Sequence, residues 1–326
     1  MKAVIRKRYG SPDVLQLAEV DQPTPGDNQV LVQVRAASVN KAEWYELTSP
    51  PLLRLISGGI RKPKRELLGA DIAGRVEAVG AKVSRFKAGD EVFGCGRGGF
   101  AEYVCAREDL LVPKPANVSF EEAAAVPVAA ITALQGLRKG GIQPGKKVLV
   151  DGASGGVGTF AVQIAKSFGA EVTAVCSARN LDLARSLGAD RVIDYDQEDF
   201  TKSGQTYDLI LGVNGHHSIW GYRRSLTPAG AYMMAGSSKL VSSLPQVMLL
   251  GPLLSRKDGR RLGFMGIAKL NQDDLAALKD LLESGKLKPF VDKTFHFSEA
   301  AEAFRYLGEG HARGKVVVTI GSAGQA

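Results

Sequence analysis

A glycine-rich segment at residues 153–158 has the residue types and spacing of a phosphate-binding loop. It reads Ala-Ser-Gly-Gly-Val-Gly and stands between an apolar run, KKVLVDG, and a run of helical character, VGTFAVQIAKSFG. Such glycines let the backbone approach a pyrophosphate, and the following helix N-terminus offers N–H donors. Since strand, loop and helix follow in the required order, we expect a dinucleotide-binding loop rather than a turn that only packs a helix on a sheet. The expected contacts are Ser154, Gly155, Gly156, Val157 and Gly158.

The end of the next apolar run indicates which nicotinamide dinucleotide binds. An NAD-binding protein usually carries Asp or Glu about 20 residues after the glycines, where it binds the ribose 2′-hydroxyl. Here residues 175–179 read Val-Cys-Ser-Ala-Arg, without an acid. Ser177 and Arg179 can donate to a 2′-phosphate, and Tyr195 follows the third strand. These residues favour NADPH over NADH; the alternative for Arg179 is a solvated residue at a helix start.

The segments around these residues alternate between short apolar runs and helical ones from residue 147 onward. This alternation is typical of βαβ units and predicts an α/β fold with a doubly wound parallel sheet. Helices are expected at VGTFAVQIAKSFG and NLDLARSLG. Strands are expected at KKVLVDG, AEVTAVC, RVIDY, YDLILGV and AYMMAGS.

The first 120 or so residues have a different character, with short apolar runs separated by Gly and Pro. Residues 30–36 alternate apolar and polar side chains, which predicts a half-buried strand. Ser119 and Glu122 have the spacing of a capping box ahead of an Ala-rich helix. The final segment returns to helix and strand patterns that we assign to the first domain. We therefore expect a β-rich domain at residues 1–122 and 268–326 and a dinucleotide-binding domain at residues 123–267.

Four segments together resemble the zinc-free medium-chain dehydrogenase/reductases, especially the zeta-crystallin-like quinone oxidoreductases and their reticulon-interacting branch. They are GASGGVGTFAVQIAK, AAAVPVAAITALQGL, SLGADRVIDY and GHARGKVVV. The resemblance implies a GroES-like catalytic domain, a Rossmann domain and an active site in the cleft between them. It also implies further cofactor contacts, with Phe264 and Met265 lining the nicotinamide. The other implied contacts are Thr132, His311, Ala312 and Arg313.

The loop after the fourth strand departs from that family. The family commonly shows an Asp-x-x-Gly ending, whereas this chain reads Leu-Gly-Val-Asn-Gly over residues 211–215. We expect Asn214 to contact the nicotinamide ribose.

The positions of the zinc ligands in the zinc-dependent relatives carry other residues in this chain. Those relatives place Cys after the third strand of the catalytic domain and Gly-His-Glu ahead of the next strand. Here Asn40 and Ala70 stand at those positions, and neither is a zinc ligand. The four histidines show no metal spacing, so we predict no metal site. Because polarising a simple ketone without a Lewis acid is difficult, the resemblance favours an activated acceptor, a quinone or an α,β-unsaturated carbonyl.

Asn40 and Tyr45 are the candidate catalytic residues, within the segment NKAEWY. Their side chains can hydrogen-bond the acceptor carbonyl and stabilise the charge that develops on it. Tyr45 is one candidate proton donor and solvent is the other. The alternative is that Asn40 caps a turn and Tyr45 only packs. In family quinone reductases Asp often stands where this chain has Glu43.

Composition limits the class of protein and of partner. The chain has 326 residues and a formal net charge of +8, which permits an anionic partner such as a phosphate-bearing cofactor. Basic clusters at residues 61–65 and 256–261 lack interleaved aromatic residues, so nucleic acid is not the expected partner. The first residues, MKAVIRKRYG, lack the apolar core of a signal peptide, so we expect none. The sequence also has no apolar run of membrane-spanning length and three cysteines far apart in sequence, and we expect a cytoplasmic protein. The resemblance implies that the protein forms a homodimer.

The function expected from these features is NADPH-dependent, zinc-independent hydride transfer to a quinone or an α,β-unsaturated carbonyl. Two alternatives stay open: a 2-alkenal or enoyl-thioester reductase, and a low-turnover module that binds NADPH or RNA. The apolar PPLLRLI at residues 50–56 either shapes the acceptor site, contacts a partner or forms an ordinary packed loop.

Overall fold

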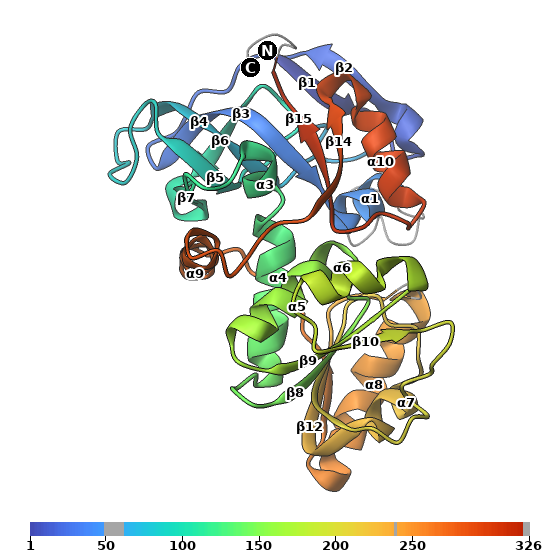
Figure 1. Ribbon diagram of the computed structural model, residues 1–326. Helices are drawn as coiled ribbons and strands as arrows, with labels where there is room; N and C mark the ends of the chain where they lie inside the picture. Colours follow the sequence, from blue (N-terminus) through green and yellow to red (C-terminus); the bar gives the residue numbers. More distant parts are fainter. Residues whose placement is uncertain (49–61, 238–239, 322–326) are drawn as a thin grey trace. The chain divides into compact units, whose positions relative to one another are not determined.

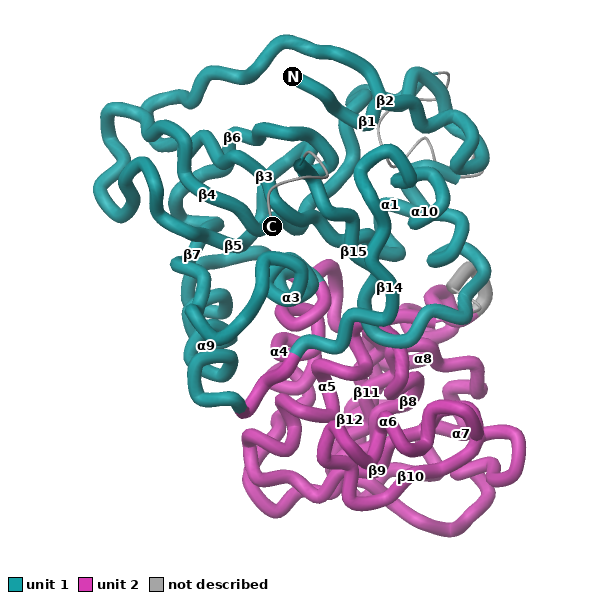
Figure 2. Tube along the Cα trace, turned by 45° about the horizontal axis from the view of Figure 1, so that its top comes forward, with its two compact units in different colours: residues 1–128, 270–285, 289–326 teal, residues 129–269, 286–288 magenta. Residues whose placement is uncertain are grey.

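The computed structural model describes residues 1–48, 62–237 and 240–321, and the chain divides into two compact units (Figures 1 and 2). Unit 1 comprises Met1–Val128, Leu270–Gly285 and Pro289–Ala326, and unit 2 comprises Ala129–Lys269 and Lys286–Lys288. The domain boundaries expected from the sequence stay a prediction. The PPLLRLI segment and residue 61 of the first basic cluster lie outside the described residues.

Unit 1 is built on a β-sheet with strand order β14-β15-β3-β4-β5-β7, to which β6 is added on β3. The strands of this sheet are β3 (Gln29–Val39), β4 (Asp71–Val79), β5 (Glu91–Cys95), β6 (Tyr103–Arg107), β7 (Leu111–Pro113), β14 (Val291–His296) and β15 (Lys315–Thr319). Strands β1 (Lys2–Arg6) and β2 (Leu15–Glu19) pair with each other in a separate two-stranded sheet. The helices of unit 1 are α1 (Lys41–Thr48), α3 (Phe120–Ala124), α9 (Gln272–Glu283) and α10 (Ala300–Gly308). Short 3-10 turns are η1 (Pro12–Val14), η2 (Glu108–Leu110) and η4 (Phe297–Glu299).

Strand β3 is longer and more buried than its alternating segment predicts. It continues to Val39, and the residues from Ala36 to Val39 are all buried. The reason is its place in the sheet: β4, β6 and β15 all pair with it, and helix α3 contacts it. The expected capping box is present, because Ser119 Oγ accepts from the Glu122 N–H and Glu122 accepts from the Ser119 N–H.

Unit 2 contains a six-stranded parallel sheet with strand order β10-β9-β8-β11-β12-β13. Its strands are β8 (Lys147–Asp151), β9 (Glu171–Cys176), β10 (Arg191–Asp194), β11 (Tyr207–Gly212), β12 (Leu226–Met234) and β13 (Arg261–Phe264). Its helices are α5 (Gly156–Ser167), α6 (Leu181–Ser186), α7 (Ile219–Arg224) and α8 (Leu240–Asp258), with a 3-10 turn, η3 (Ala178–Asn180). Helix α4 (Pro127–Gly140) begins at the last two residues of the first segment of unit 1 and continues into unit 2. The predicted α/β fold class is confirmed.

Helices α7 and α8 and strand β13 were not expected from the sequence. Helix α8 contains Pro245 and Pro252, residues that normally argue against a helix interior. Strand β13 is only four residues long and includes a glycine, and its parallel pairing with β12 supplies the stabilisation that its own sequence does not. No helix within the described residues is long and apolar enough to cross a membrane.

Candidate functional site

The glycine-rich loop joins β8 to α5 with geometry that only small residues allow. Gly152 has φ +92°, and a Cβ there would lie 2.8 Å from Cβ of Asn214. A Cβ on Gly158 would overlap the carbonyl oxygen of Gly152, so this glycine lets α5 pack against the end of β8. Gly155 is the N-cap of α5 and has no side chain to cap it. The first turn of the helix can therefore offer its N–H groups to an anionic ligand.

A buried amide links the loop to the end of β9. Asn180 donates from Nδ2 to Ser154 Oγ at 3.1 Å and to Ser177 Oγ at 3.0 Å. The η3 turn brings Asn180 back toward the strand end, where it is 4% exposed. Its Oδ1 is a buried acceptor with no hydrogen-bond partner among the described residues. Asn180 was not predicted as a site residue. The feature that could have indicated it is an Asn immediately before a short helix.

The remaining residues predicted for the 2′-phosphate lie at the same edge of the sheet. Arg179 is exposed, and Tyr195, which follows β10, is 47% exposed and donates its backbone N–H to the Cys176 carbonyl at 3.1 Å. The ring of His216, from the loop after β11, lies 6.3 Å from the Tyr195 ring in an edge-on arrangement. His216 was not among the residues predicted for this site.

Three of the other cofactor contacts predicted in unit 2 also lie at or just after the carboxyl ends of strands, and the fourth, Thr132, does not. The Asn214 N–H donates to the Asp151 carbonyl at 3.1 Å, which places Asn214 beside the glycine-rich loop. Phe264 ends β13 opposite Met234, and the Met265 N–H donates to the Met234 carbonyl at 3.1 Å. Thr132 stands apart from these strand ends, within helix α4, and is half-buried.

These features fit a dinucleotide. Parallel α/β sheets bind ligands outside the carboxyl ends of their strands, and the predicted residues gather there. The loop provides close backbone approach, the N-terminus of α5 provides donors, and the orphaned Asn180 Oδ1 provides an acceptor for a ligand hydroxyl. No carboxylate ends β9.

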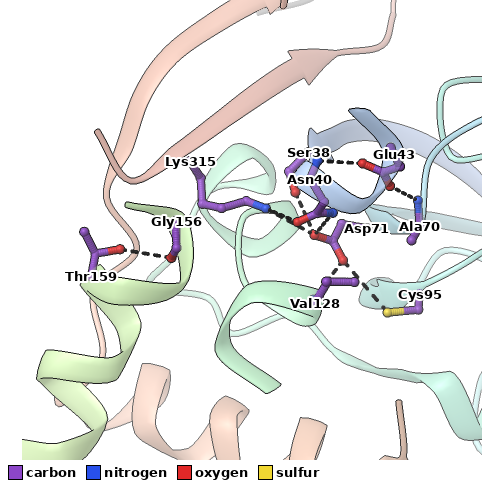
Figure 3. A network of polar contacts seen from close by, with 10 residues as sticks. All are labelled: Ser38, Asn40, Glu43, Ala70, Asp71, Cys95, Val128, Gly156, Thr159 and Lys315. Carbon is purple, nitrogen blue, oxygen red and sulfur yellow. Dashed lines mark hydrogen bonds and ion pairs between the residues drawn. The ribbon is translucent and has the colours of Figure 1, made fainter. Parts of the chain in front are cut away.

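Unit 1 contains a buried polar network around Asp71, shown in Figure 3. Asp71 Oδ2 accepts from Ser38 Oγ at 2.7 Å and from Asn40 Nδ2 at 2.9 Å, while Oδ1 accepts from the Val128 N–H at 2.9 Å. Lys315 Nζ lies 3.5 Å from Oδ2. The Asp71 side chain is fully buried, so these partners stabilise a charge that water cannot reach.

The sheet register explains how residues so distant in sequence meet. Ser38 on β3 pairs with Asp71 on β4, and Val39 pairs with Val316 on β15. Asn40 therefore follows β3 beside Lys315, the first residue of β15. Lys315 Nζ donates to Asn40 Oδ1 at 2.5 Å. Neither Asp71 nor Lys315 was assigned a functional role from the sequence.

Glu43 holds the backbone at Asn40 and Ala70, the two residues that the sequence resemblance places at zinc-ligand positions. Its side-chain carboxyl group accepts from the Asn40 N–H at 2.5 Å and from the Ala70 N–H at 2.9 Å. Burial, together with the nearby charge of Asp71, raises the pKa of Glu43 to about 8. Within the part of the chain that the structure describes, no group of three or more His, Cys, Asp or Glu side chains is arranged to hold a metal ion.

Tyr45 lies one turn beyond this network on α1. Its side chain is 38% exposed, and partial burial raises the pKa of its phenol, which keeps the phenol protonated at neutral pH. Lys41 Nζ lies 5.9 Å from the centre of the Tyr45 ring. The structure thus places Asn40 inside the network, immediately before α1, and Tyr45 at a more exposed position within α1.

The predicted residues His311, Ala312 and Arg313 form the loop before β15. The Arg313 N–H donates to Asp292 Oδ2 at 2.8 Å, and the same oxygen accepts from Tyr306 Oη at 2.7 Å. These contacts fix the path of the loop toward Lys315.

Comparison with known proteins defines the class of this chain. A family profile described as "Alcohol dehydrogenase GroES-like domain" matches residues 26–116, and one described as "Zinc-binding dehydrogenase" matches residues 187–318. The chloroplastic quinone-oxidoreductase QR1 of Triphysaria versicolor is 34% identical over 98% of this chain and 98% of its own length. The chain therefore belongs to the medium-chain dehydrogenase/reductase family and is an enzyme of that family, which confirms the resemblance found in the sequence.

Two further relatives are similar over the full chain. The chloroplastic NADPH-dependent alkenal/one oxidoreductase of Arabidopsis thaliana is 34% identical over 98% of this chain and 79% of its own length. The solved structure of the quinone oxidoreductase from Coxiella burnetii has a TM-score of 0.85 and 30% identity, covering 98% of this chain and 99% of that chain. A nicotinamide dinucleotide is accordingly the cofactor of this enzyme.

Proposed function

We propose that this protein is an NADPH-dependent, zinc-independent reductase of quinones or α,β-unsaturated carbonyl compounds. The observation that carries the proposal is the end of β9, where Asn180 holds Ser177 beside the glycine-rich loop and no carboxylate is present to repel a 2′-phosphate. The names of the relatives support the acceptor class: one is a quinone oxidoreductase, and the other is an alkenal/one oxidoreductase, a name that also fits the 2-alkenal alternative.

Binding of the 2′-phosphate is assigned to Ser177, Arg179 and Tyr195. A guanidinium and two hydroxyl groups supply charge-assisted hydrogen bonds to a phosphate. Ser154 and residues 155–158 hold the pyrophosphate, Asn214 the nicotinamide ribose, and Phe264 with Met265 the nicotinamide. Thr132 and the loop of His311, Ala312 and Arg313 complete the proposed cofactor contacts.

The acceptor is assigned to Asn40 and Tyr45. NADPH supplies the hydride when it is bound. Asn40 donates an N–H to the acceptor oxygen and stabilises the negative charge that grows there, and Tyr45 gives its phenolic proton to the same enolate or hydroquinone oxygen and recovers it from solvent. Zinc independence is proposed because Asn40 and Ala70 stand where zinc ligands would be required.

The discriminating experiment is NADPH oxidation by the purified protein against a panel of quinones, enones, 2-alkenals and enoyl thioesters. Steady turnover with a quinone or a simple enone supports the main proposal. Turnover confined to alkenals or enoyl thioesters selects the alternative reductase. Binding of NADPH or of RNA that weakens with salt, without turnover of any acceptor, would contradict the enzymatic proposal.

We also propose that the protein is a homodimer and that it is cytoplasmic. For a homodimer, light scattering at micromolar concentration should give twice the chain mass, and a monomeric mass would contradict the proposal. A cytoplasmic location predicts recovery in the cytosolic fraction of the source cell, whereas the two curated relatives described above are chloroplastic. Recovery with an organelle would overturn that location.

A further inference from the structure

The buried ammonium of Lys315 has no role in the function proposed above. We propose that Lys315 is a positioning residue, whose Nζ fixes the side-chain amide of Asn40 so that one of its N–H groups is held for the acceptor. The inference rests on the proposed function for the identity of the acceptor. The orientation of the amide itself follows from contacts within unit 1.

The hydrogen-bonding capacity of an amide shows why the orientation is fixed. Asn40 Oδ1 accepts from Lys315 Nζ at 2.5 Å, and Nδ2 donates one hydrogen to Asp71 Oδ2 at 2.9 Å. Turning the amide over would set its NH₂ group against an ammonium and its oxygen against a carboxylate, which is repulsive at both ends. Since Nδ2 has two hydrogens, one N–H is left after Asp71 is satisfied.

Burial makes this arrangement strong. The side chains of Lys315 and Asp71 are 3% and 0% exposed, and Asn40 is 8% exposed. Water therefore does not compete for these groups, and electrostatic interactions are stronger than at the surface. An ammonium on Oδ1 also polarises the amide, which makes the remaining N–H a better donor to a developing oxyanion.

The fold supplies the lysine from the far end of the chain. Lys315 stands 275 residues after Asn40, and only the pairing of β15 with β3 brings the two together. Because its side chain is only 3% exposed, Lys315 differs from lysines that bury the aliphatic part of the side chain and leave the ammonium in water. Lys315 is the first residue of β15 and follows the His311–Arg313 loop by two residues.

The test compares full-length Lys315→Met with Lys114→Met. Lys114 is a matched control, since it is 7% exposed and its Nζ donates to the Pro115 and Val118 carbonyls, outside the Asp71 network. With an acceptor found in the panel, Lys315→Met should lower kcat about 10-fold or more, the order expected for an impaired oxyanion donor, with little change in NADPH affinity. Lys114→Met should leave kcat within about twofold, less than the loss of one oriented donor.

A double-variant cycle separates positioning from general structural damage. If Lys315 acts through Asn40, Lys315→Met should have no further effect on kcat in an Asn40→Ala background. Equal losses of kcat in both backgrounds would overturn the proposal. Lys315→Met leaves the buried charge of Asp71 without its ion-pair partner and could fail to fold for that reason. In that case the double variant Lys315→Met/Asp71→Asn, which removes both buried charges, is used instead. It is expected to show the loss of kcat expected for Lys315→Met.

A measurement without turnover distinguishes failure of this inference from failure of the proposed function. The side-chain NH₂ signals of Asn40 are identified in ¹H–¹⁵N spectra by their loss in Asn40→Asp. They should shift in Lys315→Met and stay unchanged in Lys114→Met. Unchanged Asn40 signals in Lys315→Met would overturn the positioning role. Shifted signals in a protein that reduces no acceptor would retain the positioning role and reject the proposed reaction.

Discussion

Two side-chain amides, those of Asn180 and Asn40, each organise one candidate site. Asn180 donates hydrogen bonds to two serines at the carboxyl ends of β8 and β9, which we call the cofactor edge, and its buried Oδ1 is left to accept from a ligand. Asn40 is held between a buried ammonium and a buried carboxylate. Because an amide has a donor end and an acceptor end, its partners determine which end faces a ligand. A single substitution at the acceptor site should therefore change mainly kcat, and one at the cofactor site should change mainly the affinity for NADPH.

Replacing Tyr45 by Phe should lower kcat with little change in NADPH affinity. The phenol is proposed to donate one hydrogen bond and a proton to the acceptor, and loss of such a bond corresponds to about 1.5–3 kcal/mol, or about 10- to 100-fold. The control is Tyr103→Phe, since Tyr103 bonds Gln33 on β3. An unchanged kcat for Tyr45→Phe, where hydride transfer limits the rate, would remove Tyr45 from the site.

Glu43 should give stability a measurable pH dependence. Its pKa is raised from 4.5 to about 8 in the fold, so the folded chain retains a proton that the unfolded chain releases. The corresponding stability is fully present below pH 4.5 and is lost as the pH rises toward 8. Between those values the wild type should lose stability relative to Glu43→Gln, by at most about 1.4 kcal/mol per pH unit. Urea unfolding across this range measures the difference, and parallel curves would contradict it.

The strand–loop–helix element from β8 to α5 determines whether the cofactor edge forms. Gly158 allows α5 to approach the strand end, and Gly152 makes room for Asn214. At the same scale, β3, β4 and β15 bring Ser38, Asp71 and Lys315 together through their register. Each site is therefore a property of paired elements and not of one segment.

Gly158→Ala should weaken NADPH binding by about 10-fold or more and lower the unfolding temperature, because the added methyl group must displace the loop from the helix. Titration of NADPH fluorescence and thermal unfolding measure the two effects. Gly263→Ala is the matched control, since a Cβ at Gly263 meets no atom within 4 Å. Equal NADPH affinity in Gly158→Ala and the wild type would contradict the proposed role of the loop.

At the scale of the whole molecule, the sequence predicted features that are local and missed those that depend on pairing. The glycine-rich loop and the parallel sheet were predictable because motif and alternation lie within one stretch of chain. Asn40 was identified as a candidate, but its partner Lys315 was not, since no local pattern reveals the register of β15 against β3. Asn180 was missed because its role depends on the path of the η3 turn.

Metal removal tests the proposed zinc independence of the enzyme. Because Asn40 and Ala70 replace the residues that would bind zinc, prolonged treatment with a chelator should leave kcat unchanged. Elemental analysis of the same sample provides the control. Stoichiometric zinc that is lost together with activity would show that residues elsewhere hold a catalytic metal.

Cofactor preference tests the central claim most directly. We expect kcat/KM to be at least about 10-fold higher with NADPH than with NADH, which corresponds to about 1.4 kcal/mol. Arg179→Ala should reduce this ratio by weakening NADPH, while Arg185→Ala, whose side chain pairs with Asp182 on α6, should not. A wild-type enzyme that prefers NADH, or an Arg179→Ala variant impaired equally with both cofactors, would contradict the assignment of Ser177, Arg179 and Tyr195 to a 2′-phosphate.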